Sequence, residues 1–210
     1  MFALIDDQQI TKFFSGNKGV TIGDVQYPKS IFTLWSEAER NAIGIYEVTV
    51  DTTNKKDEQW YINNNVSYGV ESNKAVGSYG TATAKAHADS TYTNQDKTDG
   101  LIPDGKDVGD IKDRGLKYNL IQPVKKQAAG ILQDTDWYIV RKADAGTAVP
   151  SAITTHRAAV RTKAAEQETQ ITNASDTPAI ETLYTYVNTA DEGDPVVMER
   201  PLGELPTLDS

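Results

Sequence analysis

The spacing of apolar residues changes along the chain, and this change limits the fold more than any other feature of the sequence. From residue 116 onward, Leu116, Leu120, Val124 and Ala128 recur every fourth position, which is the spacing of one face of an α-helix. Residues 45–50 instead alternate and are rich in Tyr and Val, which is typical of a strand. Strand signals followed by helix signals predict an α+β fold, with a small mostly-β N-terminal unit, a helical-hairpin C-terminal unit and an extended tail.

Residues 1–88 are predicted to form the β-rich domain, with one short helix. The opening "MFALIDD" indicates a first strand, and the Gly-Asp pair in "VTIGDVQYPKSIF" indicates a hairpin. Ser36 and Glu39 have the spacing of a capping box, so the helix should begin at Glu37. The stretch "EQWYINNNVSYGVESNKAV" predicts two strands around the Asn turn, and the Ala-rich "TATAKAHADS" predicts a helix.

Residues 89–115 are rich in Asp, Gly, Thr and Lys and are predicted to be a polar linker or a long loop. Five of the seven aspartates in this segment raise the question of calcium: Asp96, Asp99, Asp104, Asp107 and Asp110. An EF-hand needs Asp or Asn at its first, third and fifth positions and Gly at the sixth. With Gly100 at the sixth position, Gln95 and Lys97 occupy the first and third, so the pattern does not fit. Turn residues explain the composition better, and no metal site is predicted.

Residues 116–188 are predicted to be a helical domain. The first helix begins or kinks near Pro123. The stretch "TDWYIVRK" after it is short and is predicted to be an extended connection. A second helix starts with Ser151 as N-cap and carries His156 and other residues of one stripe, and a third follows Ser175 or Asp176. The apolar residues of these two helices are Ile153, Val160, Ala164, Ile171, Ile180, Leu183, Tyr184 and Val187.

Residues 189–210 are acidic and contain prolines that prevent a helix, so they are predicted to be an extended tail. The tail carries more apolar residues than a solvated acidic segment needs: Val196, Val197, Met198, Leu202, Leu205 and Leu208. We therefore expect it to be ordered against another surface, either its own β-domain or a neighbouring subunit. The partner interpretation predicts that deleting residues 191–210 leaves the remaining chain as stable as before.

Composition excludes several classes of function. The net charge of −9 argues against binding to nucleic acid or to an anionic membrane. The chain has no Cys, which excludes disulfides, thiolate zinc sites and cysteine nucleophiles. No signal peptide or membrane-spanning run is apparent, so we expect no membrane association. No cofactor motif is present either, since "GNKG" lacks the spacing of a phosphate-binding loop.

The candidate catalytic residues are few. His156 and His87 have no acid or nucleophile nearby in sequence, so a packed helix position explains His156 better than general base catalysis does. Glu37 and Glu39 lie two residues apart and would point to different faces of a helix. The aromatic residues of the N-terminal part fit a buried core better than an exposed sugar- or protein-binding face: Trp35, Tyr46, Trp60, Tyr61, Tyr68 and Tyr79. The chain is therefore predicted not to be an enzyme.

The stretch "ILQDTDW", followed by "VP" and "ITTHRAAVR", resembles a phage family described as tail assembly chaperones. The resemblance covers about residues 116–165. The residues that match its two motifs are Ile131, Leu132, Thr135, Asp136 and Trp137 in the first and Arg157, Val160 and Arg161 in the second, with His156 where the family usually has Tyr.

The N-terminal stretch "YPKSIFTLWSEAERNAIGIYEV", with "DEQWY" after it, is similar to short phage tail and tail-fibre assembly proteins. Together the two resemblances imply a non-enzymatic morphogenesis protein in the host cytoplasm that contacts other tail or tail-fibre proteins and forms a homo-oligomer. The alternatives are a permanent subunit of the virion tail and, more remotely, a glycan or cell-wall hydrolase.

The resemblance also suggests how the motif residues are used. Trp137 is expected to be buried in the corner between two antiparallel helices, while Asp134 or Asp136 caps a helix or pairs with an arginine. The candidate contact or scaffold residues are therefore Trp137, Asp136, Arg157, Arg161, Val196, Leu202 and Leu205.

Overall fold

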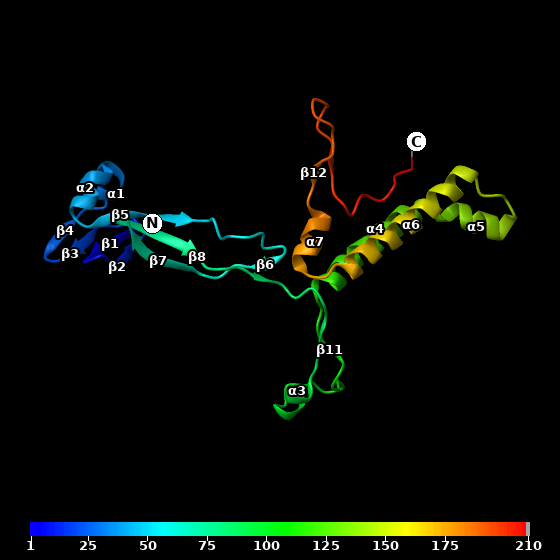
Figure 1. Cartoon of the computed structure of the whole chain (residues 1–210), viewed down its shortest axis with the longest axis horizontal. Helices are drawn as coiled ribbons and strands as arrows, with labels where there is room; N and C mark the ends of the chain where they lie inside the picture. Colours follow the sequence, from blue (N-terminus) through cyan, green and yellow to red (C-terminus); the bar gives the residue numbers. More distant parts are fainter. Residues whose placement is uncertain (209–210) are drawn as a thin grey trace. The chain divides into compact units, whose positions relative to one another are not determined.

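The computed structural model describes residues 1–208 and divides the chain into two compact units, Met1–Thr83 and Ala84–Ser210. The first is mostly β and the second contains the long helices, so the α+β class predicted from the sequence is confirmed (Figure 1). The sequence placed the boundary at residue 88 and a linker at 89–115. In the structure the boundary follows Thr83, and residues 89–115 belong to the second unit. Within the described residues, no helix combines the length and apolar character needed to cross a membrane.

A five-stranded sheet forms the first unit, in the order β2-β1-β5-β8-β7. Strands β1 and β2 form one antiparallel hairpin and β7 and β8 another, while β5 runs antiparallel to β1 and parallel to β8. The two outer strands approach each other, since the rings of Phe13 and Tyr68 lie 5.0 Å apart. The strand bounds are Phe2–Asp6 (β1), Gln9–Phe14 (β2), Ile45–Asp51 (β5), Val66–Glu71 (β7) and Lys74–Tyr79 (β8).

Two tight turns set the register of these hairpins. Asp7 and Gln8 connect β1 to β2, and Ser72 and Asn73 connect β7 to β8, all with positive φ. Positive φ at both central residues is the geometry of a type I′ turn, which matches the twist of the strands it joins. The Asn run at residues 63–65, predicted to be the turn, instead separates β6 (Tyr61–Ile62) from β7, and β6 pairs with β9 (Thr83–Ala84).

The core of the first unit lies under the connection between β2 and β5. This connection contains the predicted hairpin, β3 (Val20–Ile22) and β4 (Val25–Tyr27), followed by α1 (Ile31–Leu34) and α2 (Glu37–Ala42). The capping box of Ser36 and Glu39 is present, so the predicted start at Glu37 is confirmed, but α1 was not predicted. The buried residues are Phe14, Val20, Ile31, Phe32 and Ile45.

The second unit is built on two long helices, α4 (Leu116–Gln133) and α6 (Ser151–Asn173), which pack against each other. Helix α4 continues through Pro123. Helix α7 (Thr177–Tyr184) follows α6 and is capped by the Asp176 side chain. Of the two predicted starts, Ser175 and Asp176, the second is therefore confirmed. The stripe predicted for α6 is buried, including His156. The core residues are Val124, Ala128, Val160, Ala164, Ile171, Leu202 and Leu205.

Residues 81–90, predicted to form a helix, instead contain β9 and the start of β10 (Ser90–Thr91), and residues 85–89 between them have no regular secondary structure and contact α4 and α7. The carbonyl oxygens of Ala86 and His87 accept from the backbone N–H groups of Leu116 and Lys117, which have no partner inside their own helix. The carbonyl of Lys85 accepts from the hydroxyl of Thr177 at 2.7 Å. A side chain at Gly115 would collide with the backbone of Ala88, at 2.3 Å from its oxygen, so this contact requires glycine.

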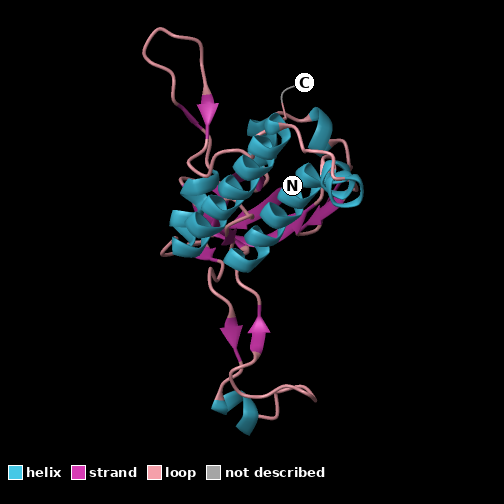
Figure 2. Cartoon of the chain, turned by 90° about the vertical axis from the view of Figure 1, so that its right-hand side faces the viewer, coloured by secondary structure: helices cyan, strands magenta, loops and turns pink. Residues whose placement is uncertain are grey.

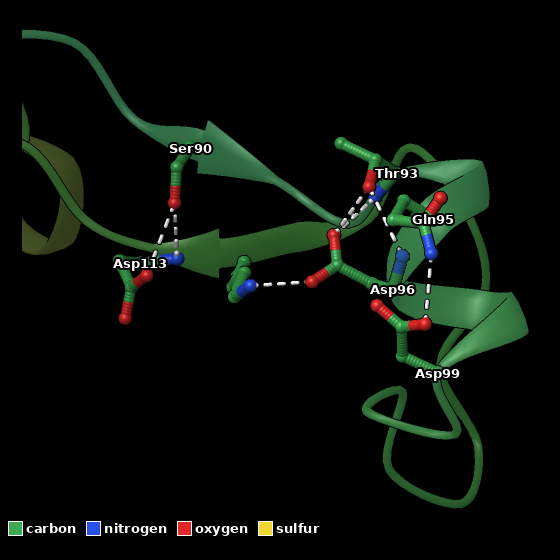
Figure 3. A network of polar contacts seen from close by, with 7 residues as sticks. Ser90, Thr93, Gln95, Asp96, Asp99 and Asp113 are labelled. Carbon is green, nitrogen blue, oxygen red and sulfur yellow. Dashed lines mark hydrogen bonds and ion pairs between the residues drawn. The ribbon is translucent and has the colours of Figure 1, made fainter.

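Residues 90–113 form an arm that extends away from the helices (Figure 2). Strand β10 (Ser90–Thr91) pairs with β11 (Ile111–Asp113), and α3 (Asn94–Thr98) lies between them. Lys112 Nζ lies 2.5 Å from Asp96 Oδ1, and the other carboxylate oxygen accepts from the backbone and hydroxyl of Thr93 (Figure 3). The arm therefore has its own polar network and is not the unstructured loop or linker that the sequence suggested.

The end of the chain differs from the predicted extended tail. Strand β12 (Val187–Asn188) pairs with β13 (Met198–Glu199) in a second hairpin, which also extends away from the helices (Figures 1 and 2). After it the chain returns to the helices, where Leu202 is 1% exposed and Leu205 is buried in the core. The interpretation that this tail waits for a partner is therefore wrong for Leu202 and Leu205, because their own helices bury them.

A candidate protein-contact surface at the corner of the helices

The corner between α4 and α6 is organised around the guanidinium group of Arg157. This residue lies on the face of α6 that carries the buried stripe, and it is 7% exposed. One terminal nitrogen donates to the carbonyl oxygen of Leu132 at 2.7 Å and to the hydroxyl of Thr135 at 2.6 Å. The other lies 2.8 Å from the carboxylate of Asp136. One side chain of α6 therefore holds the end of α4 and the start of the next helix.

These contacts follow from the electrostatics of helix ends. The last carbonyls of α4 have no partner within the helix and carry partial negative charge, which a cation stabilises. Asp136 lies in the first turn of α5 (Asp136–Ala145), where the exposed N–H groups favour a negative charge. Thr135, which is buried between the two helices, also donates to Leu132. Arg157 thus joins a negative helix end to an acidic helix start.

Helix α5 replaces the extended connection predicted from "TDWYIVRK". The stretch is short and rich in apolar residues, which is also typical of a strand, so its composition alone favours an extended connection. Two signals of a helix were present: Asp136 suits a first turn, and Gly146 follows the last turn with φ 69°, the left-handed conformation that commonly ends helices. None of the residues of α5 is buried. The helix is therefore attached to the corner but presents most of its surface to solvent.

Trp137 is 51% exposed, so the prediction that it fills the corner is wrong. Its ring lies 3.7 Å from that of Tyr138, and the guanidinium of Arg141 lies 4.8 Å from the Trp137 ring. Val140 is 65% exposed and Ile139 is also exposed. Thr135 and Arg157 occupy the position in the corner that was predicted for Trp137. Their polar side chains form hydrogen bonds at the end of α4, which an apolar side chain does not. Trp137 is left as part of an apolar surface.

The other predicted site residues separate into two groups. Arg161 lies one turn beyond Arg157 on α6 and is exposed, so it does not take part in the corner. Val196 is 70% exposed on the second hairpin, whereas Leu202 and Leu205 belong to the core. The structure thus brings Asp136 and Arg157 together, leaves Trp137 beside them on the surface, and places the tail residues elsewhere. Tyr138, Ile139, Val140 and Arg141 were missed because α5 was not recognised as a helix.

The titratable groups of residues 1–208 show no arrangement typical of catalysis. His156 is buried on α6 among the residues that face α4. Residues 1–208 contain no cluster of three or more His, Asp or Glu side chains suited to a metal ion. The aspartate with the strongest perturbation is Asp96, whose pKa is held far below its usual range by the Lys112 ammonium and by hydrogen bonds from Thr93. This perturbation stabilises the arm, since the partners of Asp96 all belong to it.

Comparison with known proteins adds no relative: no family model matches the chain, and neither the curated proteins nor the solved structures compared with it gave a match.

Proposed function

We propose that the chain is a non-enzymatic phage morphogenesis protein that acts in tail or tail-fibre assembly through protein–protein contacts. The observation that carries the proposal is the corner around Arg157. The motif residues that resemble the tail assembly chaperone family are separated by more than twenty positions in sequence, yet Leu132, Thr135 and Asp136 all bind Arg157. The residues of the two motifs therefore contact each other and form one structural unit, the corner around Arg157. This arrangement supports the resemblance.

The surface of α5, beside the corner around Arg157, supports a role in binding proteins. Aromatic residues and arginine are enriched where proteins contact each other, and isolated domains rarely expose several large apolar residues together. Trp137, Ile139 and Val140 are exposed on one short helix, with Arg141 stacked on the tryptophan. A helix that buries none of its residues contributes little to the core, so its apolar side chains are available for a partner.

Deletion of the gene from a phage that encodes this chain tests the proposal. We expect the deletion to give particles without complete tails or tail fibres in electron micrographs, and the wild-type chain to be missing from purified virions by mass spectrometry. Presence of the chain in virions at a fixed ratio to a tail protein would favour the permanent tail subunit instead. Normal particles from the deletion would contradict both assignments, and release of soluble sugars from purified cell walls or glycans would favour the hydrolase.

A further inference from the structure

The tip of the second hairpin, residues 189–198, is an acidic surface with exposed apolar side chains. Every residue from 191 to 199 is exposed. Asp191, Glu192 and Asp194 lie in the turn, and Val196, Val197 and Met198 follow them. A backbone hydrogen bond of 2.8 Å from Thr189 to Val197 holds the two sides together. The hairpin tip is therefore held in shape by its own backbone, but nothing in the described chain covers its apolar residues.

The surface of α5 has the complementary character. Trp137 and Val140 lie one helical turn apart and supply the apolar part, and Arg141 and Lys142 follow directly in the sequence. Of the acids here, Asp136 is paired with Arg157, and Asp134 and Asp144 are exposed. Residues 134–162 together contain four basic and three acidic residues. In a chain with net charge −9, this end of the helical unit is therefore slightly basic, whereas the hairpin tip is acidic.

The two surfaces lie at opposite ends of the helical unit. Helix α5 lies at the N-terminal end of α6. Helix α7 and then the hairpin follow the C-terminal end of α6 (Figure 1). Helix α6 has 23 residues, and at 1.5 Å per residue its ends are on the order of 30 Å apart. The return of Leu202 to the core, with its N–H bonded to Leu183, anchors the base of the hairpin at the α7 end. The hairpin tip therefore cannot reach α5 of its own chain.

We propose that the hairpin tip of one copy docks on α5 of a second copy, head to tail. Val196, Val197 and Met198 cover Trp137 and Val140, and the acids of the tip face Arg141 and Lys142. Because the two surfaces differ, a bound pair of copies still offers one free tip and one free α5. Such a contact gives a ring if the rotation closes and a filament if it does not. The proposal rests on these two surfaces and does not depend on the phage assignment.

Two variants separate the halves of the contact. The tip variant carries Asp194→Lys and Val196→Lys, and the α5 variant carries Val140→Gln and Lys142→Gln, so that the two altered surfaces do not attract each other. All four residues are exposed, so both variants should keep the circular dichroism spectrum and the melting curve of the wild type. Leu34→Glu is the matched control, because Leu34 is an exposed apolar residue of the first unit.

Light scattering and sedimentation of the full chain provide the readout. We expect the mass of the wild type and of Leu34→Glu to rise with concentration, and to fall again as added salt screens the charges. Each double variant alone should be monomeric. An equimolar mixture of the two should give a dimer and nothing larger, because the tip variant still offers α5 and the α5 variant still offers the tip.

Three results would overturn the proposal. The first is a wild type that stays monomeric up to about 0.5 mM, a concentration at which even weak specific contacts form. The second is undiminished association of either double variant, which would place the contact elsewhere. The third is a mixture of the two variants that remains monomeric although the wild type associates, which would show that the tip and α5 are not partners. A monomeric wild type would leave the tail-assembly proposal standing, since that proposal is decided by the phage deletion.

Discussion

Arg157 connects three segments of the chain through one side chain. Its hydrogen bonds to Leu132 and Thr135 use groups that are buried or lie at a helix end, and its ion pair reaches Asp136, which is largely exposed. The exposed ion pair should add little stability, because solvent screens it. The buried hydrogen bonds should add more, because they come from a charged donor and are shielded from solvent.

Replacing Arg157 by Ala is expected to lower the free energy of unfolding by about 2–3 kcal/mol, because it removes buried hydrogen bonds from a charged donor. Asp136→Asn should cost less than about 1 kcal/mol because the carboxylate is exposed. Urea unfolding followed by circular dichroism measures both. Arg161→Ala on the same helix is the control and should change stability by no more than about 0.5 kcal/mol. Equal effects of Arg157→Ala and Arg161→Ala would show that the corner is not formed in solution.

The sequence could not show that a polar group, and not Trp137, occupies the corner. The spacing of Ile153, Val160, Ala164 and Ile171 located the buried face of α6 correctly, and Arg157 lies on it. However, a charged residue on a predicted core face is read as exposed unless its partners are known, and these partners are the carbonyl of Leu132 and the hydroxyl of Thr135. Backbone carbonyl groups leave no trace in a sequence pattern, since every residue has one.

Among the elements, the arm of residues 90–113 depends on charge more than on apolar burial. Asp96 is buried within it and is bound by Lys112 and Thr93. The pKa of the Asp96 carboxyl is lowered, chiefly by the Lys112 ammonium, and the pKa of Lys112 is raised, chiefly by Asp96. The pair is therefore fully charged across the neutral range, and the order of the arm should depend on that charge.

We expect the arm to lose order in acid while the helices remain folded. Because the pKa of Asp96 is lower in the folded arm, its contribution is complete above the unfolded value of about 4 and is lost as the pH falls further toward the folded value. Amide exchange of residues 90–113 between neutral pH and about pH 2 would follow this loss. Asp96→Asn should open the arm at neutral pH and remove the pH dependence. Asp104→Asn, an exposed position of the same arm, should behave as wild type, and an arm equally protected at every pH would contradict the prediction.

The returning segment after β13 stabilises the helical unit through Leu202 and Leu205. Truncating a fully buried Leu to Ala typically costs about 2–5 kcal/mol, so Leu202→Ala should lower the stability of the helical unit by that amount. Leu208→Ala should have an effect below about 0.5 kcal/mol, because Leu208 is exposed. Thermal unfolding compares the two variants. Identical melting of both would restore the interpretation of a tail that is free until a partner binds.

Local signals explain which elements the sequence predicted well. The strands β1, β3, β4 and β5, the start of α2 and the buried stripe of α6 all follow from turn residues, capping residues or periodicity. The errors concern segments whose structure depends on distant partners. Residues 85–89 have a helical composition, yet they are not helical, because their carbonyls bind the first N–H groups of α4 and the hydroxyl of Thr177. Strand β2 was missed because the Asp7-Gln8 turn lacks the Gly or Asn that usually marks a type I′ turn.

For the whole molecule, two compact units with separate cores should unfold separately. One core contains Ile31 and Ile45, and the other contains Val160 and Ile171. We expect two transitions in calorimetry, because cooperative unfolding normally involves one continuous core. Ile45→Ala should lower one transition and Val160→Ala the other. A single transition that both substitutions lower together would show that the units unfold as one.

The burial of Leu202 and Leu205 also sets an order of events during synthesis. Domains generally fold as units while the chain emerges from the ribosome, N-terminal parts first. The β unit can therefore fold while the helical unit is still being made. Helices α4 and α6 leave the ribosome next, but the core between them lacks two of its buried leucines until the segment after β13 has been translated. Until then the nascent chain presents an apolar groove, so the helical unit should become resistant to proteases only late in translation.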